Sequence, residues 1–226
     1  MFVRYAIFYT PPVDSALADF GARWLGWNSA TGRTVTHPFV DGLDVASVTQ
    51  TPRKYGFHAT LKAPFRLAEG VTEGDLIAAL ETFATDTPPV VLDGLVQGYF
   101  RGFVALRPVG DTTALNGLAA QIVRNFDSLR APLRDADIAR RRQAGLNARQ
   151  DAQMLAWGYP YIFEDFHFHM TLSGSVSPDI ADRVMHAISA PVARALPQPM
   201  LLDAVTLMGE DSSGLFHQIH RCTLSG

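Results

Sequence analysis

The chain has 226 residues, of which 47% are hydrophobic and 18% are charged, and its formal net charge is −3. This composition is ordinary for a globular protein, and it excludes the broad basic surface of proteins that bind long nucleic acids. The single cysteine, Cys222, allows no disulfide within the chain, and no apolar run approaches the length of a membrane span. We therefore expect a cytoplasmic protein of one large domain or two fused lobes, with no membrane partner.

The first half of the chain is predicted to contain four strands and two helices. The opening stretch is rich in aromatic and aliphatic residues and stops at two prolines, which indicates a strand and not a signal peptide. Thr72 and Asp75 have the spacing of a capping box, which predicts the start of a helix. A loop-like stretch covers 28–52, and Pro64 is expected to end the second strand. The predicted strands are 2–10, 55–62, 90–97 and 102–107, and the predicted helices are 15–27 and 72–84.

The second half is predicted to repeat much of this order. Amphipathic spacing indicates several helices, and the prolines from Pro191 onward are expected to break the chain after the last of them. A turn at 210–214 separates the final two strands. The predicted helices are 115–129, 135–144, 148–157 and 179–189, and the predicted strands are 166–173, 200–208 and 216–224.

One phrase, His-x-Thr-Leu, occurs twice, at 58–61 and at 169–172. On a strand, side chains alternate between faces, so each copy presents its histidine and its threonine on one face. Asp93 follows His58 by 35 residues, and Asp203 follows His169 by 34. This matching order predicts an internal duplication. We expect an α+β fold with mostly antiparallel sheets, in which two lobes, 1–110 and 111–226, are related by a pseudo-twofold axis and flank a central cleft.

Two histidines facing one cleft suit paired general acid and base catalysis. An imidazole titrates near neutral pH, so one ring can accept a proton while the other donates one. The hydroxyls of Thr60 and Thr171 are placed to bond the oxygens of a phosphate. No phosphate-binding glycine loop of the nucleotide-triphosphate or dinucleotide type is present, and no nucleophile elbow occurs.

The two motifs and their flanks resemble the two-histidine (2H) phosphoesterase superfamily. The stretches Tyr-Gly-Phe-His-Ala-Thr-Leu-Lys-Ala-Pro-Phe and Phe-His-Phe-His-Met-Thr-Leu-Ser-Gly are similar to the branch encoded beside bacterial carbon–phosphorus lyase genes. The resemblance implies a phosphoric diester hydrolase that needs no metal and no cofactor, with His58 and His169 catalytic and Thr60 and Thr171 binding phosphate. It implies a small cyclic phosphodiester as substrate, a nucleotide or ribosyl cyclic phosphate, in phosphonate metabolism.

Basic and aromatic residues near the motifs are further candidates for substrate binding. Arg140, Arg141 and Arg142 form the densest cationic cluster, and guanidinium groups match phosphate geometry well. The alternative is a solvated helix face. The basic residues that flank the first motif, Arg53, Lys54 and Lys62, are the other candidates. The aromatic candidates, for which a place in the core is the alternative, are Tyr5, Tyr55, Tyr159 and Tyr161.

Two other classes of function fit parts of the pattern. His167 and His169 share a strand face, and with His58 they offer three ligands for a metal-dependent hydrolase. The other alternative is a module that binds a nucleotide or an RNA end without turnover. The presence of both histidines and both threonines favours catalysis, because tight binding needs no proton donor and acceptor pair.

Overall fold

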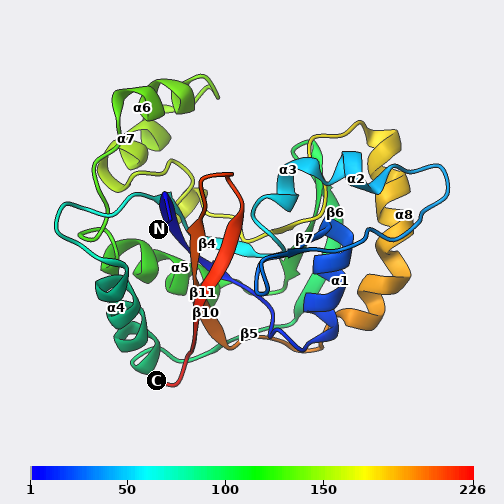
Figure 1. Ribbon diagram of the computed structural model, residues 1–226, viewed down its shortest axis with the longest axis horizontal. Helices are drawn as coiled ribbons and strands as arrows, with labels where there is room; N and C mark the ends of the chain where they lie inside the picture. Colours follow the sequence, from blue (N-terminus) through cyan, green and yellow to red (C-terminus); the bar gives the residue numbers. More distant parts are fainter. Residues whose placement is uncertain (1) are drawn as a thin grey trace.

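The computed structural model describes residues 2–226 and shows an α+β fold built on one large antiparallel sheet (Figure 1). Seven strands form this sheet in the order β11-β10-β1-β4-β8-β7-β6, and every neighbouring pair is antiparallel. The predicted fold class is therefore confirmed. The sheet strands are β1 (Arg4–Tyr9), β4 (Ala59–Phe65), β6 (Gly94–Phe100), β7 (Phe103–Val109), β8 (Met170–Thr171), β10 (Ala204–Glu210) and β11 (Phe216–Thr223).

Two small two-stranded sheets and the helices complete the fold. The remaining strands are β2 (Trp27–Asn28), β3 (Arg33–Thr34), β5 (Val90–Leu92) and β9 (Met200–Leu202). The helices are α1 (Ala16–Leu25), α2 (Val45–Val48), α3 (Gln50–Arg53), α4 (Glu73–Thr85), α5 (Thr113–Asn125), α6 (Asp135–Arg142), α7 (Ala148–Trp157) and α8 (Pro178–Ala195), with a 3₁₀ turn at Phe163–Asp165. None of the helices within 2–226 combines the length and the apolar character that crossing a membrane requires.

Local sequence signals explain where several helices begin and end. Thr72 and Asp75 form the predicted capping box at the start of α4. Ser15 caps α1 by accepting a hydrogen bond from the Ala18 amide, and Gly26 ends that helix in the left-handed conformation that glycine adopts without strain. These caps bond backbone groups that a helix terminus otherwise leaves without partners.

Several local predictions were wrong. The strand predicted over 166–173 covers only Met170–Thr171, and a 3₁₀ turn at Phe163–Asp165 precedes it. Pro64 lies inside β4 and does not end it, because a register shift between Tyr5 and Ile7 of β1 places this proline at a bulge, where no ladder amide is needed. Pro191 lies inside α8, whose buried stripe continues past it to Val192. The stretch 28–52 is not all loop, since it contains β3, α2 and α3.

The two halves of the sequence are interleaved in space. Hairpin β10–β11 lies beside β1 and packs against α4, whereas hairpin β6–β7 lies beside β8 and packs against α8. Helices α4 and α5 lie on one side of the molecule, α1 and α8 lie on the other, and α6 and α7 extend from one end (Figure 1). Each side of the molecule therefore contains elements from both halves of the sequence. The predicted lobes, 1–110 and 111–226, describe the duplicated sequence, and they stay a prediction.

Candidate active site

The two motif strands are neighbours at the centre of the sheet. Ala59 of β4 pairs with Met170 of β8, and continuing this antiparallel register by one residue places His58 opposite Thr171 and Thr60 opposite His169. Directly opposite residues on paired strands have Cβ atoms about 4.5–5.5 Å apart. Each histidine therefore lies beside the threonine of the other motif, and all four side chains are on one face.

Both imidazoles are oriented by the same kind of hydrogen bond, from Nδ1 to the backbone carbonyl two residues earlier. Nδ1 of His58 lies 2.9 Å from the carbonyl oxygen of Gly56, and Nδ1 of His169 lies 2.7 Å from that of His167. Because a carbonyl only accepts, Nδ1 carries the proton and donates in each case, which leaves Nε2 as the reactive nitrogen. Nε2 of His58 lies 3.2 Å from Oγ1 of Thr60. The neutral rings are thus oriented as proton acceptors.

Gly56 supports this orientation of His58. Its φ of +72° lies in the left-handed region, and a Cβ at this position would come within 2.8 Å of Oγ of Ser29. Only glycine places a carbonyl here without strain or collision. The sequence signal for this role is the glycine two residues before the first histidine.

Aromatic rings pack against both histidines. The ring of Phe8 is stacked on His58 with 3.9 Å between centroids, and Tyr55 lies 5.7 Å away. The ring centroid of Phe103 lies 5.5 Å from that of His169. These apolar neighbours fix the rings in place and reduce their contact with water.

The environment disfavours protonation of both imidazoles. The pKa of His58 is lowered to about 4, mainly by burial and to a smaller extent by the nearby His169, against a hydrogen bond to Gly56 that acts to raise it. Burial also lowers the pKa of His169, as does the neighbouring His167, whereas its backbone hydrogen bond acts to raise it. Both histidines are therefore neutral at pH 7 in the free protein. An anionic ligand between them would favour protonation of one ring.

A cavity of about 500 Å³ brings together most of the candidate residues. It contains both histidines and both threonines, and the predicted Tyr55, Arg140, Arg141 and Tyr159 also line it. Arg4 is a lining residue that the sequence did not indicate, because it reaches the cavity only through the pairing of β1 with β4. The arrangement can hold a small anion between two imidazoles, with cationic groups on one side.

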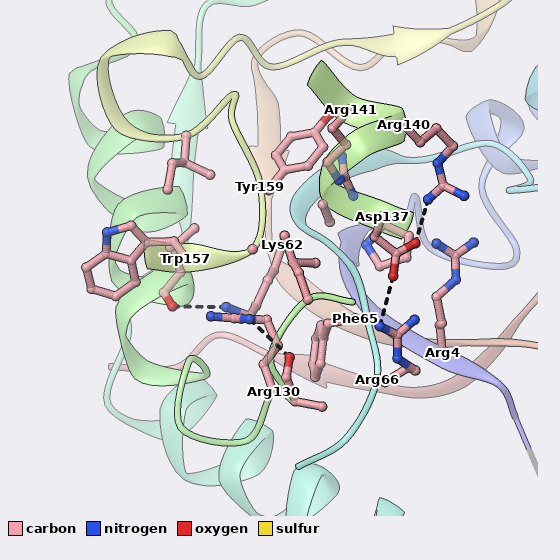
Figure 2. A pocket seen from close by; sticks show the side chains of 17 residues that line it. Arg4, Lys62, Phe65, Arg66, Arg130, Asp137, Arg140, Arg141, Trp157 and Tyr159 are labelled. Atoms are coloured by element: carbon pink, nitrogen blue, oxygen red, sulfur yellow. Dashed lines mark hydrogen bonds and ion pairs between the residues drawn. The ribbon is translucent and has the colours of Figure 1, made fainter. Parts of the chain in front are cut away.

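A narrower basic pocket continues from this cavity (Figure 2). It shares Arg4, Arg140, Arg141 and Tyr159 with the cavity and adds Lys62, Arg66 and Arg130. A second adjoining pocket, on the His169 side, is lined by Phe100, Phe103, Tyr161 and Phe166. The histidine cavity therefore has a cationic side and an aromatic side.

Three predicted binding residues lie away from the two histidines. The buried Lys62 donates to the carbonyl of Val123 and lies 3.6 Å from Asp127, so it does not line the histidine cavity. Arg142, at the end of α6, donates two hydrogen bonds to the carboxylate of Asp151 on α7. The hydroxyl of Tyr5 donates to Glu73. In this position Lys62 lines the basic pocket and not the histidine cavity, and its contact with a substrate phosphate stays a prediction.

The residues predicted for a metal site do not assemble into one. Among residues 2–226, no group of three or more His, Cys, Asp or Glu side chains is arranged to hold a metal ion. His167 lies beside His169, but it contributes its backbone carbonyl to that ring. The described residues therefore show no assembled ligand set from His58, His167 and His169, and the metal-dependent alternative stays a prediction that chelation tests.

Comparisons with known proteins place the chain among its relatives. A family model described as "Protein of unknown function (DUF1045)" matches residues 60–217. Two curated proteins, both named ribose 1,5-bisphosphate phosphokinase PhnN, are similar to 99% and 97% of the chain. The protein of Janthinobacterium sp. (strain Marseille) is 39% identical, and that of Laribacter hongkongensis (strain HLHK9) is 34% identical. The chain spans about half the length of these relatives, 51% of each.

Among solved structures, the chain is similar to TT0787 of Thermus thermophilus. The TM-score is 0.45 at 14% identity, over 99% of this chain and 98% of the other.

Proposed function

The chain belongs to the DUF1045 family, and on that premise we propose that it is a phosphoesterase that hydrolyses a small cyclic phosphodiester without a metal ion. The observation that carries the proposal is the pair of histidines at the centre of the sheet. Each has its Nδ1 bound to a carbonyl two residues earlier, which leaves Nε2 as the proton acceptor, and both line one cavity. The 2H resemblance of the two motifs supports the same reaction class.

The reaction follows from the placement of the four side chains. A cyclic phosphate lies in the cavity over the sheet face that carries both motifs, with its non-bridging oxygens accepting from the hydroxyls of Thr60 and Thr171. One neutral imidazole accepts a proton from water as the water oxygen bonds to phosphorus. The other imidazole, protonated, donates to the ring oxygen as the phosphorus–oxygen bond opposite the attack breaks. The product is an acyclic phosphomonoester, and the two histidines have exchanged protonation states.

The bound phosphate itself makes this protonation pattern accessible. Burial keeps both free imidazoles neutral, so the acid must gain its proton with the substrate. A negative charge within about 4–6 Å stabilises an imidazolium and raises its pKa. The substrate anion thus converts two neutral bases into the base and acid pair that hydrolysis needs.

The names of the relatives support a phosphorylated ribose as the substrate framework. Both are named for ribose 1,5-bisphosphate, and the chain spans about half of each. The chain contains no Gly-x-x-x-x-Gly-Lys-Ser/Thr loop, so we do not propose a kinase of that type for it. A cyclic phosphate of ribose, free or in a nucleotide, opened in phosphonate metabolism, is the substrate that we propose.

The test is hydrolysis followed by ³¹P NMR. The purified chain should convert a nucleoside 2′,3′-cyclic phosphate or a ribosyl cyclic phosphate into the monoester in the presence of excess EDTA. The matched controls are His58→Ala and His169→Ala, which should lose most of the activity, and His186→Ala, which removes an exposed imidazole on α8 and should be active. Binding without turnover would favour the non-catalytic alternative. Loss with EDTA and rescue by zinc would contradict the metal-free mechanism.

A further inference from the structure

The pocket beside the histidine cavity carries more positive charge than its carboxylates neutralise (Figure 2). Six cationic side chains line it, and five of them pair with three carboxylates. Asp137 accepts from both Arg66 and Arg140, and Asp127 serves both Lys62 and Arg130. The cationic residues are Arg4, Lys62, Arg66, Arg130, Arg140 and Arg141. This excess of charge in a partly buried pocket favours an anionic ligand.

Among the six cationic residues of this pocket, Arg141 is the one whose charge is not paired with a carboxylate of the described residues. Among the described residues, it makes no ion pair with a carboxylate, whereas its neighbours Arg140 and Arg142 both do. Its guanidinium lies 4.9 Å from the ring centroid of Tyr159, and its buried Nε has no hydrogen-bond partner within 2–226. Stacking on Tyr159 fixes the plane of the guanidinium, so its donors are oriented before a ligand arrives.

The position of this cluster separates it from the atoms that react. The ring phosphate must touch the threonines and Nε2 atoms on β4 and β8. Arg140 and Arg141 stand on α6 and Arg4 stands on β1, at the side where the cavity continues into the basic pocket. Asp137, between Arg66 and Arg140, links this part of α6 to the end of β4 (Figure 2). A ligand that binds at the histidines and extends into the basic pocket passes Arg140 and Arg141, which line both.

We propose that Arg141, with Arg140 and Arg4, forms a subsite for a terminal phosphate, and that the substrate is a cyclic phosphodiester that carries a second phosphate as a monoester. This inference rests on the proposed function and deepens it by naming the substrate class. Arginine recognises phosphate oxygens with two parallel donors, and a terminal monoester offers three oxygens where a cyclic diester offers two. Adenosine 2′,3′-cyclic phosphate with a 5′-phosphate represents this class.

The experiment compares two substrates that differ only in the second phosphate. Adenosine 2′,3′-cyclic phosphate is assayed with and without its 5′-phosphate, and kcat/KM is measured for the wild type, Arg141→Gln and Arg142→Gln. The wild type should prefer the 5′-phosphorylated substrate. In Arg141→Gln this preference should fall on the order of 10- to 100-fold, the usual effect of a lost charged hydrogen bond, mainly through KM. Arg142→Gln, the same change at the adjacent residue, should keep the preference.

Two further results separate this inference from the proposed function. If neither substrate is hydrolysed, the proposed function fails, and binding of inorganic phosphate by calorimetry still tests the subsite, since Arg141→Gln should weaken it and Arg142→Gln should not. If both substrates are hydrolysed but the preference is the same in Arg141→Gln and in the wild type, the subsite is overturned while the proposed function stands. Unchanged thermal melting of both variants excludes a folding defect as the cause.

Discussion

Acidification from pH 7 to pH 5 should destabilise the protein through His58 in particular. Burial lowers the pKa of this imidazole to about 4 in the folded chain, whereas an unfolded histidine titrates near 6.5. As the pH falls, the unfolded state therefore binds the proton first, and the free energy of unfolding decreases. For these two pKa values the loss between pH 7 and pH 5 is about 2 kcal/mol. Well below pH 4 both states are protonated, and no further loss arises from this residue.

The assay is urea-induced unfolding at pH 7, 6 and 5 for the wild type, His58→Gln and His186→Gln. Both variants replace an imidazole by an amide, but His186 is exposed on α8. The midpoint of the wild type should fall with pH more steeply than that of His58→Gln, and His186→Gln should follow the wild type. Burial also lowers the pKa of His169, so some slope should persist in His58→Gln. Equal slopes in His58→Gln and the wild type would refute the buried neutral imidazole.

Four kinetic predictions follow from the proposed mechanism. His58→Ala and His169→Ala should each lower kcat/KM by on the order of 10² to 10⁴-fold. The double variant should lose much less than the product of the two single losses. If either histidine could be removed with little loss, the two-histidine mechanism would be wrong. Thr60→Ala and Thr171→Ala should each cost about 1.5–3 kcal/mol of transition-state binding, and full activity in either would remove that hydroxyl from the phosphate site. The profile of kcat/KM against pH should be bell-shaped with its optimum below pH 6.5, because burial lowers both pKa values and one ring must be protonated; an optimum above pH 8 would contradict this. Activity should persist after exhaustive chelation, and metal-dependent rescue would overturn the mechanism.

The sequence predicted the centre of the site because the signal there is local and repeated. Period-two alternation placed each histidine on the same face as its threonine, and the two copies implied that the faces meet. The structure pairs the two strands and gathers all four side chains in one cavity. The start of α4 at Thr72 was predicted for the same reason, because a capping box depends on two residues three positions apart. Signals of this kind need no knowledge of distant packing.

The sequence failed where a residue's neighbours come from remote segments. Lys62 adjoins the first motif, but a second register shift, between Ile7 and Phe8 of β1, breaks its alternation with Thr60, and its ammonium group lies against Val123 and Asp127. Arg4 carries no motif and enters the cavity only because β1 lies beside β4. Arg141 and Arg142 are adjacent in a run of identical residues, and only the fold separates one facing the cavity from one bound to Asp151.

The pairing of the two halves explains why both motifs reach one site. Ala59 and Met170 occupy the same position in their motifs, and they pair with each other; Val91 and Leu201, each two residues before its repeated aspartate, also pair with each other. Equivalent positions meet in this way only across a twofold axis, so both contacts lie on one pseudo-twofold axis. Strand β8 has only two residues, and a slip of one residue would turn its histidine to the opposite face. The β5–β9 pair, together with β7 beside β8, therefore fixes the register on which the paired histidines depend.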